Sequence, residues 1–166
     1  MSDGAPLDVA GAGLEYVGFW PRAGAALVDT VLVLLLAAPL LMWVYGPGYF
    51  DQAPGVWAAG PADVLISYVA PAIATVVFWL TRQATPGKML VRARVVDART
   101  GGRLGLRQSV LRYLGYYVAL LPLGLGILWV AFDARKQGWQ DKIAGTVVVR
   151  PKRGADAAFL DTAPGR

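Results

Sequence analysis

Three long apolar stretches and two short β-type runs predict the elements of the chain. The first apolar stretch extends from Trp20 to Tyr45. At about 1.5 Å of rise per residue, a helix of this length reaches about 39 Å, which exceeds the hydrocarbon core of a bilayer at roughly 30 Å. We therefore expect this stretch to form a transmembrane helix.

The other two apolar stretches extend from Asp63 to Thr81 and from Ser109 to Phe132. The second predicts another transmembrane helix, kinked at Pro71, because membrane helices tolerate an internal proline. The third is long enough to span, but Pro and Gly residues within 121–126 indicate a turn at its middle. We expect a re-entrant helical hairpin there, with a third full span as the alternative.

The two short runs predict strands. Residues 88–97 alternate with a period of two, and residues 145–150 are rich in β-branched side chains. We expect them to pair in a small cytoplasmic β-hairpin or sheet beneath a membrane α-helical fold. The predicted domain division is a flexible N-terminal tail at 1–16, a membrane domain at 17–150 and a disordered C-terminal tail at 151–166.

Basic residues are distributed so unevenly that they predict a topology. None of the sixteen Lys and Arg residues lies between residues 23 and 81. The positive-inside rule then places residues 82–107 and both termini in the cytoplasm, and residues 46–61 outside. A third full span would export the basic residues after residue 132, which is why the hairpin is preferred.

Composition narrows the possible chemistry. A mean hydropathy of +0.48 with 56% hydrophobic residues indicates an integral membrane protein in contact with the lipid bilayer. The chain has no Cys and no His, which removes thiolate nucleophiles, imidazole acid/base chemistry and the usual zinc sites. We expect no metal, no cofactor and no enzymatic activity.

Asp29 lies nine residues inside the first apolar stretch. A carboxylate in the membrane needs a partner, because an unpaired charge there is costly. Arg22 lies on the same helical face and Arg112 interrupts the third stretch, while Asp141 follows that stretch in the chain. We hypothesise one buried charge cluster of Arg22, Asp29, Arg112 and Asp141; the alternative is that Asp29 binds a cation or proton.

A second group of charges lies within and after the predicted cytoplasmic strand. We interpret it as a topology determinant that contacts anionic lipid head groups, and we expect no nucleic-acid binding. Its members are Arg92, Arg94, Arg99, Arg103 and Arg107.

Several of these features together resemble the RDD family of bacterial membrane proteins. The resemblance covers roughly residues 17–150 and rests on GFWPRAGAALVD, TPGKMLVRARVVD, an Arg in the third stretch and WQDKIAGTVVV. Arg22, Asp29 and Asp141 match the Arg, Asp and Asp that name the family. Many members carry a His before the last Asp, where this chain has Gln140. The resemblance implies the bacterial cytoplasmic (inner) membrane.

Two functions remain open. A few members of the family are associated with sodium/proton exchange, and others accompany larger transport or secretion machinery. The first expectation is an accessory or assembly subunit that contacts other membrane-protein subunits. The alternative is a small oligomeric cation or proton transporter that uses Asp29.

Overall fold

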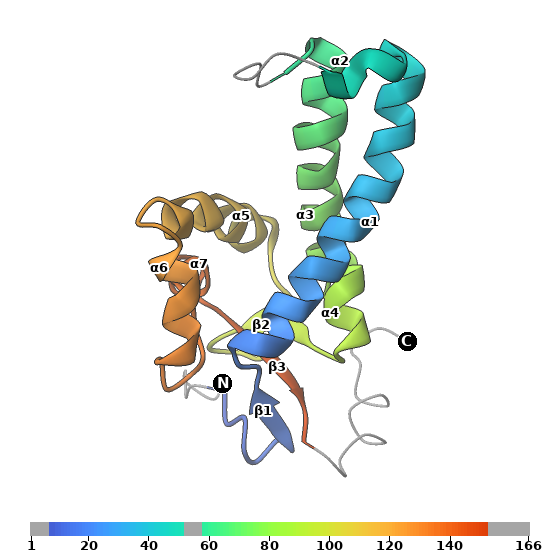
Figure 1. The fold of residues 1–166 in the computed structure, drawn as a ribbon. Helices are drawn as coiled ribbons and strands as arrows, with labels where there is room; N and C mark the ends of the chain where they lie inside the picture. Colours follow the sequence, from blue (N-terminus) through green and yellow to red (C-terminus); the bar gives the residue numbers. More distant parts are fainter. Residues whose placement is uncertain (1–6, 52–57, 153–166) are drawn as a thin grey trace.

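A computed structural model describes residues 7–51 and 58–152 of the chain. The first long helix, α1 (Phe19–Tyr45), rises from a small sheet at one end of the molecule to the opposite end (Figure 1). It ends at Gly46, which has a positive φ of 82° that glycine adopts without strain. The predicted first transmembrane helix is confirmed, since α1 is long and apolar enough to cross a membrane.

The second membrane helix returns beside the first and is longer than predicted. It consists of α2 (Pro61–Val64), the π-helical turn η2 (Leu65–Val69) and α3 (Ala70–Arg82), and a short 3₁₀ helix, η1 (Pro47–Asp51), follows α1. Pro71 lacks an amide N–H, and the wider turn directly before it accommodates the lost helical hydrogen bond. With α4 (Pro86–Leu90), this segment is the second that could cross a membrane.

The predicted strand at 88–97 is wrong in its first half. Residues Pro86–Leu90 form α4, and only Arg94–Asp97 form a strand, β2. Pro86 occupies the first helical position, where its fixed φ favours a helix start. This local signal outweighs the period-two pattern that the sequence continues through both elements.

The sheet has three antiparallel strands in the order β1-β3-β2. Its central strand is β3 (Thr146–Pro151), and Val95 of β2 lies opposite Val148 of β3. The predicted pairing of these two runs is therefore confirmed. The third strand, β1 (Leu14–Tyr16), was missed because three residues carry no measurable periodicity.

Strand β1 also corrects the predicted domain division. The expected N-terminal tail at 1–16 includes a paired strand, and the expected C-terminal tail at 151–166 begins inside β3. Leu14–Tyr16 and Pro151 are ordered because they pair with each other across the sheet, and local sequence does not indicate such a distant pairing. Residues 1–6 and 153–166 lie outside the described residues.

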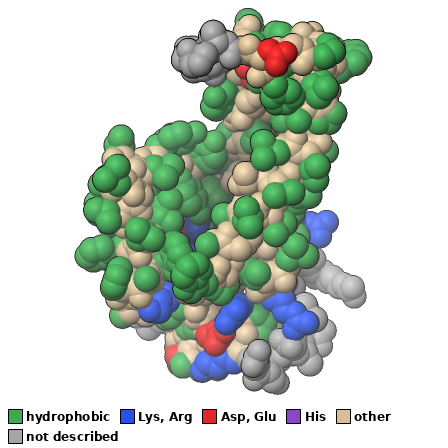
Figure 2. Space-filling view, in the orientation of Figure 1, with side chains coloured by type: hydrophobic (Ala, Val, Ile, Leu, Met, Phe, Trp, Pro, Cys, Tyr) green, Lys and Arg blue, Asp and Glu red, His purple; other side chains and the backbone are tan. Residues whose placement is uncertain are grey.

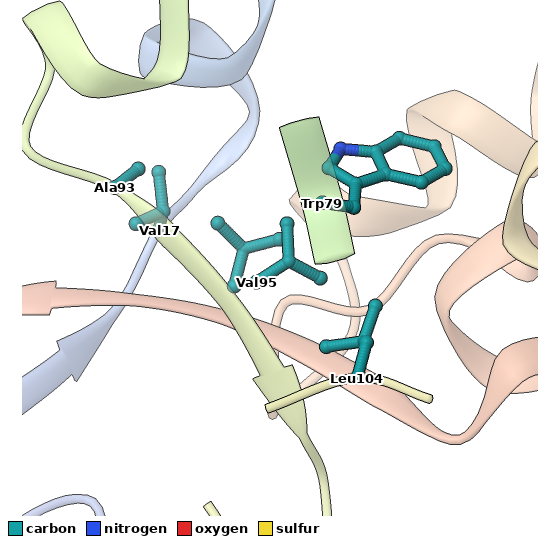
Figure 3. Packing of buried hydrophobic residues seen from close by; sticks show 6 residues of the cluster. Val17, Trp79, Ala93, Val95 and Leu104 are labelled. Atoms are coloured by element: carbon teal, nitrogen blue, oxygen red, sulfur yellow. The ribbon is translucent and has the colours of Figure 1, made fainter. Parts of the chain in front are cut away.

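A compact hydrophobic core joins the sheet to the membrane helices. Figure 3 shows Val17 before α1, Trp79 near the end of α3, and Ala93, Val95 and Leu104 from the β2 region converging there. Because Trp79 is almost fully buried at 1% exposure, this core holds the lower ends of the helices on the sheet.

The third apolar stretch is broken at the predicted turn. Helix α5 (Leu106–Leu120) is followed by α6 (Leu125–Leu128) and the 3₁₀ helix η3 (Trp129–Ala131), and the two arms are bent by 113°. Helix α7 (Trp139–Ala144) then packs on α5 and leads into β3. Figure 2 shows hydrophobic side chains over most of the long helices, with basic side chains gathered at the sheet end.

Candidate functional site: a buried arginine–aspartate cluster

Asp141 is the centre of the buried charge cluster. It is fully buried and forms ion pairs with two arginines that are distant in sequence. Arg22 Nη1 lies 2.5 Å from Asp141 Oδ2, and Arg112 Nη1 pairs with Asp141 Oδ1. One carboxylate therefore connects α1, α5 and α7.

The local structure of α7 orients Asp141. Gly138 is the N-cap residue of α7, and its backbone N–H donates to Asp141 Oδ2 over 3.0 Å. An acid at this third helical position satisfies an otherwise unpaired backbone donor and interacts favourably with the helix dipole. The orientation of Asp141 is thus set partly by its own helix, in addition to the two arginines.

Arg22 ties the first turn of α1 to the C-terminal segment. Its Nε donates to the carbonyl oxygen of Val17 over 2.9 Å, and its Nη2 donates to that of Lys136 over 2.6 Å. With the Asp141 ion pair, every nitrogen of this guanidinium has an acceptor. Arg22 therefore holds α1 against the segment that contains Lys136 and Asp141.

Arg112 is enclosed more completely than Arg22, with no exposed surface. Its Nη1 also donates to Thr146 Oγ1 over 2.7 Å. The guanidinium carbon lies 5.2 Å from the centroid of the Trp79 ring, which is within cation–π range. Arg112 therefore connects α5 to α3, α7 and β3.

Two opposing effects determine the ionisation of Asp141. Burial alone would raise the pKa of this carboxyl, but the positive charges of Arg112 and Arg22 and the Gly138 N–H outweigh burial. The pKa of Asp141 is therefore held below its ordinary value, and the group is an anion at neutral pH.

Asp29 does not join this cluster, contrary to the hypothesis of a four-residue group. Its Oδ2 accepts a hydrogen bond of 2.5 Å from Thr85 Oγ1, and its Oδ1 accepts one of 2.7 Å from the Gly87 N–H. Within residues 7–51 and 58–152, Asp29 makes no ion pair. Arg22 and Asp29 share a face but lie about 10 Å apart along the helix, so each contacts a different neighbour.

Gly87 allows α4 to approach α1 closely. A Cβ atom at this position would lie 2.0 Å from the carbonyl oxygen of Ala25 and 3.0 Å from Asp29 Cγ. Neither Thr85 nor Gly87 was predicted as a site residue, although Thr-Pro-Gly before an apolar run is a recognisable helix start.

A second carboxylate site that the sequence analysis missed lies at the other end of the membrane helices. Asp63 is 4% exposed and accepts hydrogen bonds from Tyr49 Oη at 3.0 Å, Ser67 Oγ at 2.7 Å and the Ala59 N–H at 2.8 Å. Its own N–H donates to Tyr45 Oη over 3.0 Å. Asp63 thereby joins the end of α1 to the start of α2.

The predicted lipid-facing basic patch lies around β2 and the start of α5. Arg94 is half-buried, and the others are exposed: Arg92, Arg99, Arg103 and Arg107. In the part of the chain that the structure describes, no group of three or more Asp or Glu side chains could hold a metal ion.

Two apolar helices above a small sheet, joined by a buried arginine–aspartate cluster, define a small membrane protein. The chain belongs to the RDD family, whose model matches residues 16–145. This match includes Arg22, Asp29, Arg112 and Asp141.

Relatives from several bacteria agree with this assignment. The uncharacterized membrane protein YteJ of Bacillus subtilis (strain 168) is 32% identical over 146 residues, which cover 82% of each chain. An uncharacterized protein of Rickettsia prowazekii (strain Madrid E) is 37% identical over 45% of this chain and 41% of its own. A proline-rich antigen homolog of Mycobacterium tuberculosis is 35% identical over 38% of this chain and 26% of its own.

The chain thus matches less than half the length of the Rickettsia and Mycobacterium relatives. No solved structure matches it. The comparisons therefore show membership of a membrane-protein family.

A double-mutant cycle tests how the charges are grouped. Asp141→Asn should destabilise the protein by about 3–5 kcal/mol because two arginines stay buried without their anion. Combined with Arg112→Gln, it should show a coupling of about 1–3 kcal/mol. Asp29→Asn should instead be additive with Arg112→Gln to within about 0.5 kcal/mol, since the residues share no contact. Reversible unfolding in mixed micelles measures the free energy of unfolding of the wild type, the three single variants and the two double variants, and strong coupling of Asp29 to Arg112 would contradict this grouping.

A second test concerns the close contact of α4 with α1. Gly87→Ala should separate the two helices and lower the melting temperature by several degrees, because the new Cβ meets backbone atoms of Ala25 that have little freedom to move. Gly24→Ala is the matched control, since a Cβ there meets nothing within 4 Å. Equal melting temperatures for the two variants would show that α4 does not pack on α1 as described.

Proposed function

We propose that this chain is a non-enzymatic accessory or assembly subunit of a bacterial inner-membrane complex, such as transport or secretion machinery. One observation carries the proposal: both family carboxylates are already occupied by donors of the chain itself. Asp141 is held by two arginines, and Asp29 by Thr85 and Gly87. Carboxylates used in this way fix helix packing and leave few positions for a substrate.

The surface of the membrane helices supports partners within the bilayer. Only Ala25, Ala37 and Leu41 of α1 are buried, while Leu35 and Leu36 remain 67% and 75% exposed. An apolar groove of about 400 Å³ also runs between α1 and α3. Lipid chains and neighbouring helices would share these surfaces, since helix association in membranes depends on close packing.

The sheet supports the proposed topology. Strands β1, β2 and β3 come from before α1, between α4 and α5, and after α7, and they form one sheet. All three must therefore lie on the same side of the membrane. With residues 82–107 in the cytoplasm, both ends of the described chain are cytoplasmic, and the bent α5–α6 segment enters and leaves on that side.

The same arrangement supports contact with lipid head groups. The basic patch lies beside the sheet, at the ends of the membrane helices, where anionic head groups would be within reach. We assign these arginines to the cytoplasmic leaflet and to no nucleic acid.

A small oligomeric cation or proton transporter is the second candidate. The observation that favours it is the half-buried position of Asp29, whose charge is compensated by a hydroxyl and a backbone amide rather than by a cation. Each Asp29 oxygen accepts only one of these hydrogen bonds and so retains a lone pair that could bind a cation or a proton. The two functions differ in what the loss of the Asp29 charge would do.

Topology is tested first, and the absence of native cysteines makes single-cysteine labelling straightforward. Phe50→Cys, Arg99→Cys and Lys152→Cys place a thiol on η1, near the sheet and after β3. In intact cells, a membrane-impermeant thiol reagent should label only the first variant. External labelling at position 152 would mean that the α5–α6 segment crosses the membrane fully.

The accessory role is tested by isolating the tagged full chain from its native membrane in mild detergent. The wild type should co-purify in constant proportion with other membrane subunits. Asp29→Asn should lower both its melting temperature and the recovery of those subunits, because α4 loses its attachment to α1. Asp51→Asn, which removes an exposed charge on η1, is the control and should change neither.

The transporter candidate predicts a different result. Asp29→Asn would then leave melting temperature and co-purification unchanged but abolish cation- or pH-driven flux in proteoliposomes. Such flux in the purified wild type, lost in Asp29→Asn and retained in Asp51→Asn, would contradict the accessory role.

A further inference from the structure

Hydrogen-bond donors without acceptors gather around Arg112. Within the described ranges, four buried donor atoms have no partner: Arg112 Nε, Arg112 Nη2, Trp79 Nε1 and Ser109 Oγ. The three residues are at most 1% exposed. Buried donors are nearly always satisfied in folded proteins, and an unsatisfied charged donor is especially costly. In the cluster, Arg112 contacts Asp141 and Thr146 through Nη1 alone, and the Tyr116 hydroxyl also interacts with its guanidinium group.

These donors belong to one region of the fold. Ser109 precedes Arg112 by three residues on α5 and therefore lies on the same helical face. The Trp79 ring contacts the guanidinium and stacks on Tyr116, with ring centroids 6.3 Å apart. The unpaired donors thus surround the contact between α3 and α5.

Lys88 adds a third cation beside this region. It is 7% exposed, and its Nζ makes one long hydrogen bond of 3.5 Å to Thr85 Oγ1. The guanidinium carbon of Arg112 lies 6.0 Å from the centroid of the Tyr116 ring, and the charge of Lys88 also acts through space on the Tyr116 hydroxyl.

The region carries a surplus of positive charge. It contains three cationic side chains, Lys88, Arg22 and Arg112, but only two carboxylates, Asp29 and Asp141. Both carboxylates already accept hydrogen bonds or form ion pairs. Two buried acceptor atoms here also lack a hydrogen bond: Gln140 Oε1, which carries no charge, and Asp141 Oδ1, which is ion-paired with Arg112 Nη1. Figure 2 shows a recess between the α5–α6 segment and the α1–α3 pair, with basic side-chain atoms at its floor.

We propose that this donor cluster binds a phosphate group. A tetrahedral oxyanion accepts several hydrogen bonds at once and would neutralise the surplus charge, which an uncharged ligand or water would leave in place. Lys88 and Arg112 would supply the charge, and Trp79 and Ser109 would supply neutral donors. The site is separate from the proposed subunit contacts and does not depend on them.

The phosphate group could belong to the free ion or to an anionic phospholipid, and two arms distinguish these sources. In the first, the melting temperature of the full chain in a neutral detergent is followed as inorganic phosphate replaces chloride at constant ionic strength. In the second, nanodiscs of phosphatidylcholine are compared with nanodiscs that also contain phosphatidylglycerol. A ligand that binds only the folded protein raises the melting temperature with concentration.

The variants are Lys88→Gln and, as its matched control, Lys152→Gln, which removes an exposed charge outside the region. Lys88→Gln should weaken the apparent affinity about tenfold or more, because it removes a charge-assisted hydrogen bond. Lys152→Gln should leave it unchanged. If Lys88→Gln does not fold, Ser109→Ala replaces it, and native mass spectrometry counts the retained phosphate or phospholipid.

The outcomes separate clearly. Stabilisation by inorganic phosphate assigns the site to the free ion, and stabilisation only by phosphatidylglycerol assigns it to a lipid head group. Stabilisation in neither arm, or an equal loss in Lys88→Gln and Lys152→Gln, would overturn the proposal.

Discussion

The ionised carboxylate of Asp141 is the constraint on which the rest of the structure depends. It is fully buried, and a buried anion is tolerated only where cations and hydrogen-bond donors surround it. Arg22 and Arg112 meet this requirement only if the start of α1, the middle of α5 and the first turn of α7 come together. One charge thereby determines how the C-terminal half is held against the first membrane helix.

The other contacts extend from this point along the helices. Asp29 lies about two helical turns after Arg22 on α1 and attaches α4 to α1 there, and Gly87 allows the close approach of the two helices. Asp63 joins the membrane helices at their opposite end. Three separate carboxylates thus hold the membrane helices in place, although the apolar surfaces of these helices bury very little of one another. A protein of this kind completes its packing with lipid or with other subunits.

Local patterns predicted the membrane helices, the turn in the third stretch and the pairing of β2 with β3. They were insufficient where tertiary contacts override local preference. Strand β1 has three residues and exists because an edge of β3 accepts it. Helix α4 has a different cause: it replaces the first half of a predicted strand because the local helix start at Pro86 outweighs the period-two pattern, and Gly87 then lets the helix fit against Ala25.

For the candidate site, the sequence by itself predicted that Asp29 needs a partner, since a charge inside a long apolar stretch is costly when unpaired, and it grouped Arg22, Arg112 and Asp141 with Asp29. It did not determine the pairing. Arg22 and Asp29 share a helical face in the sequence, yet the fold brings Asp141 to the first and the start of α4 to the second. Charges attract at any sequence separation, so only the path of the chain between them decides which ones meet.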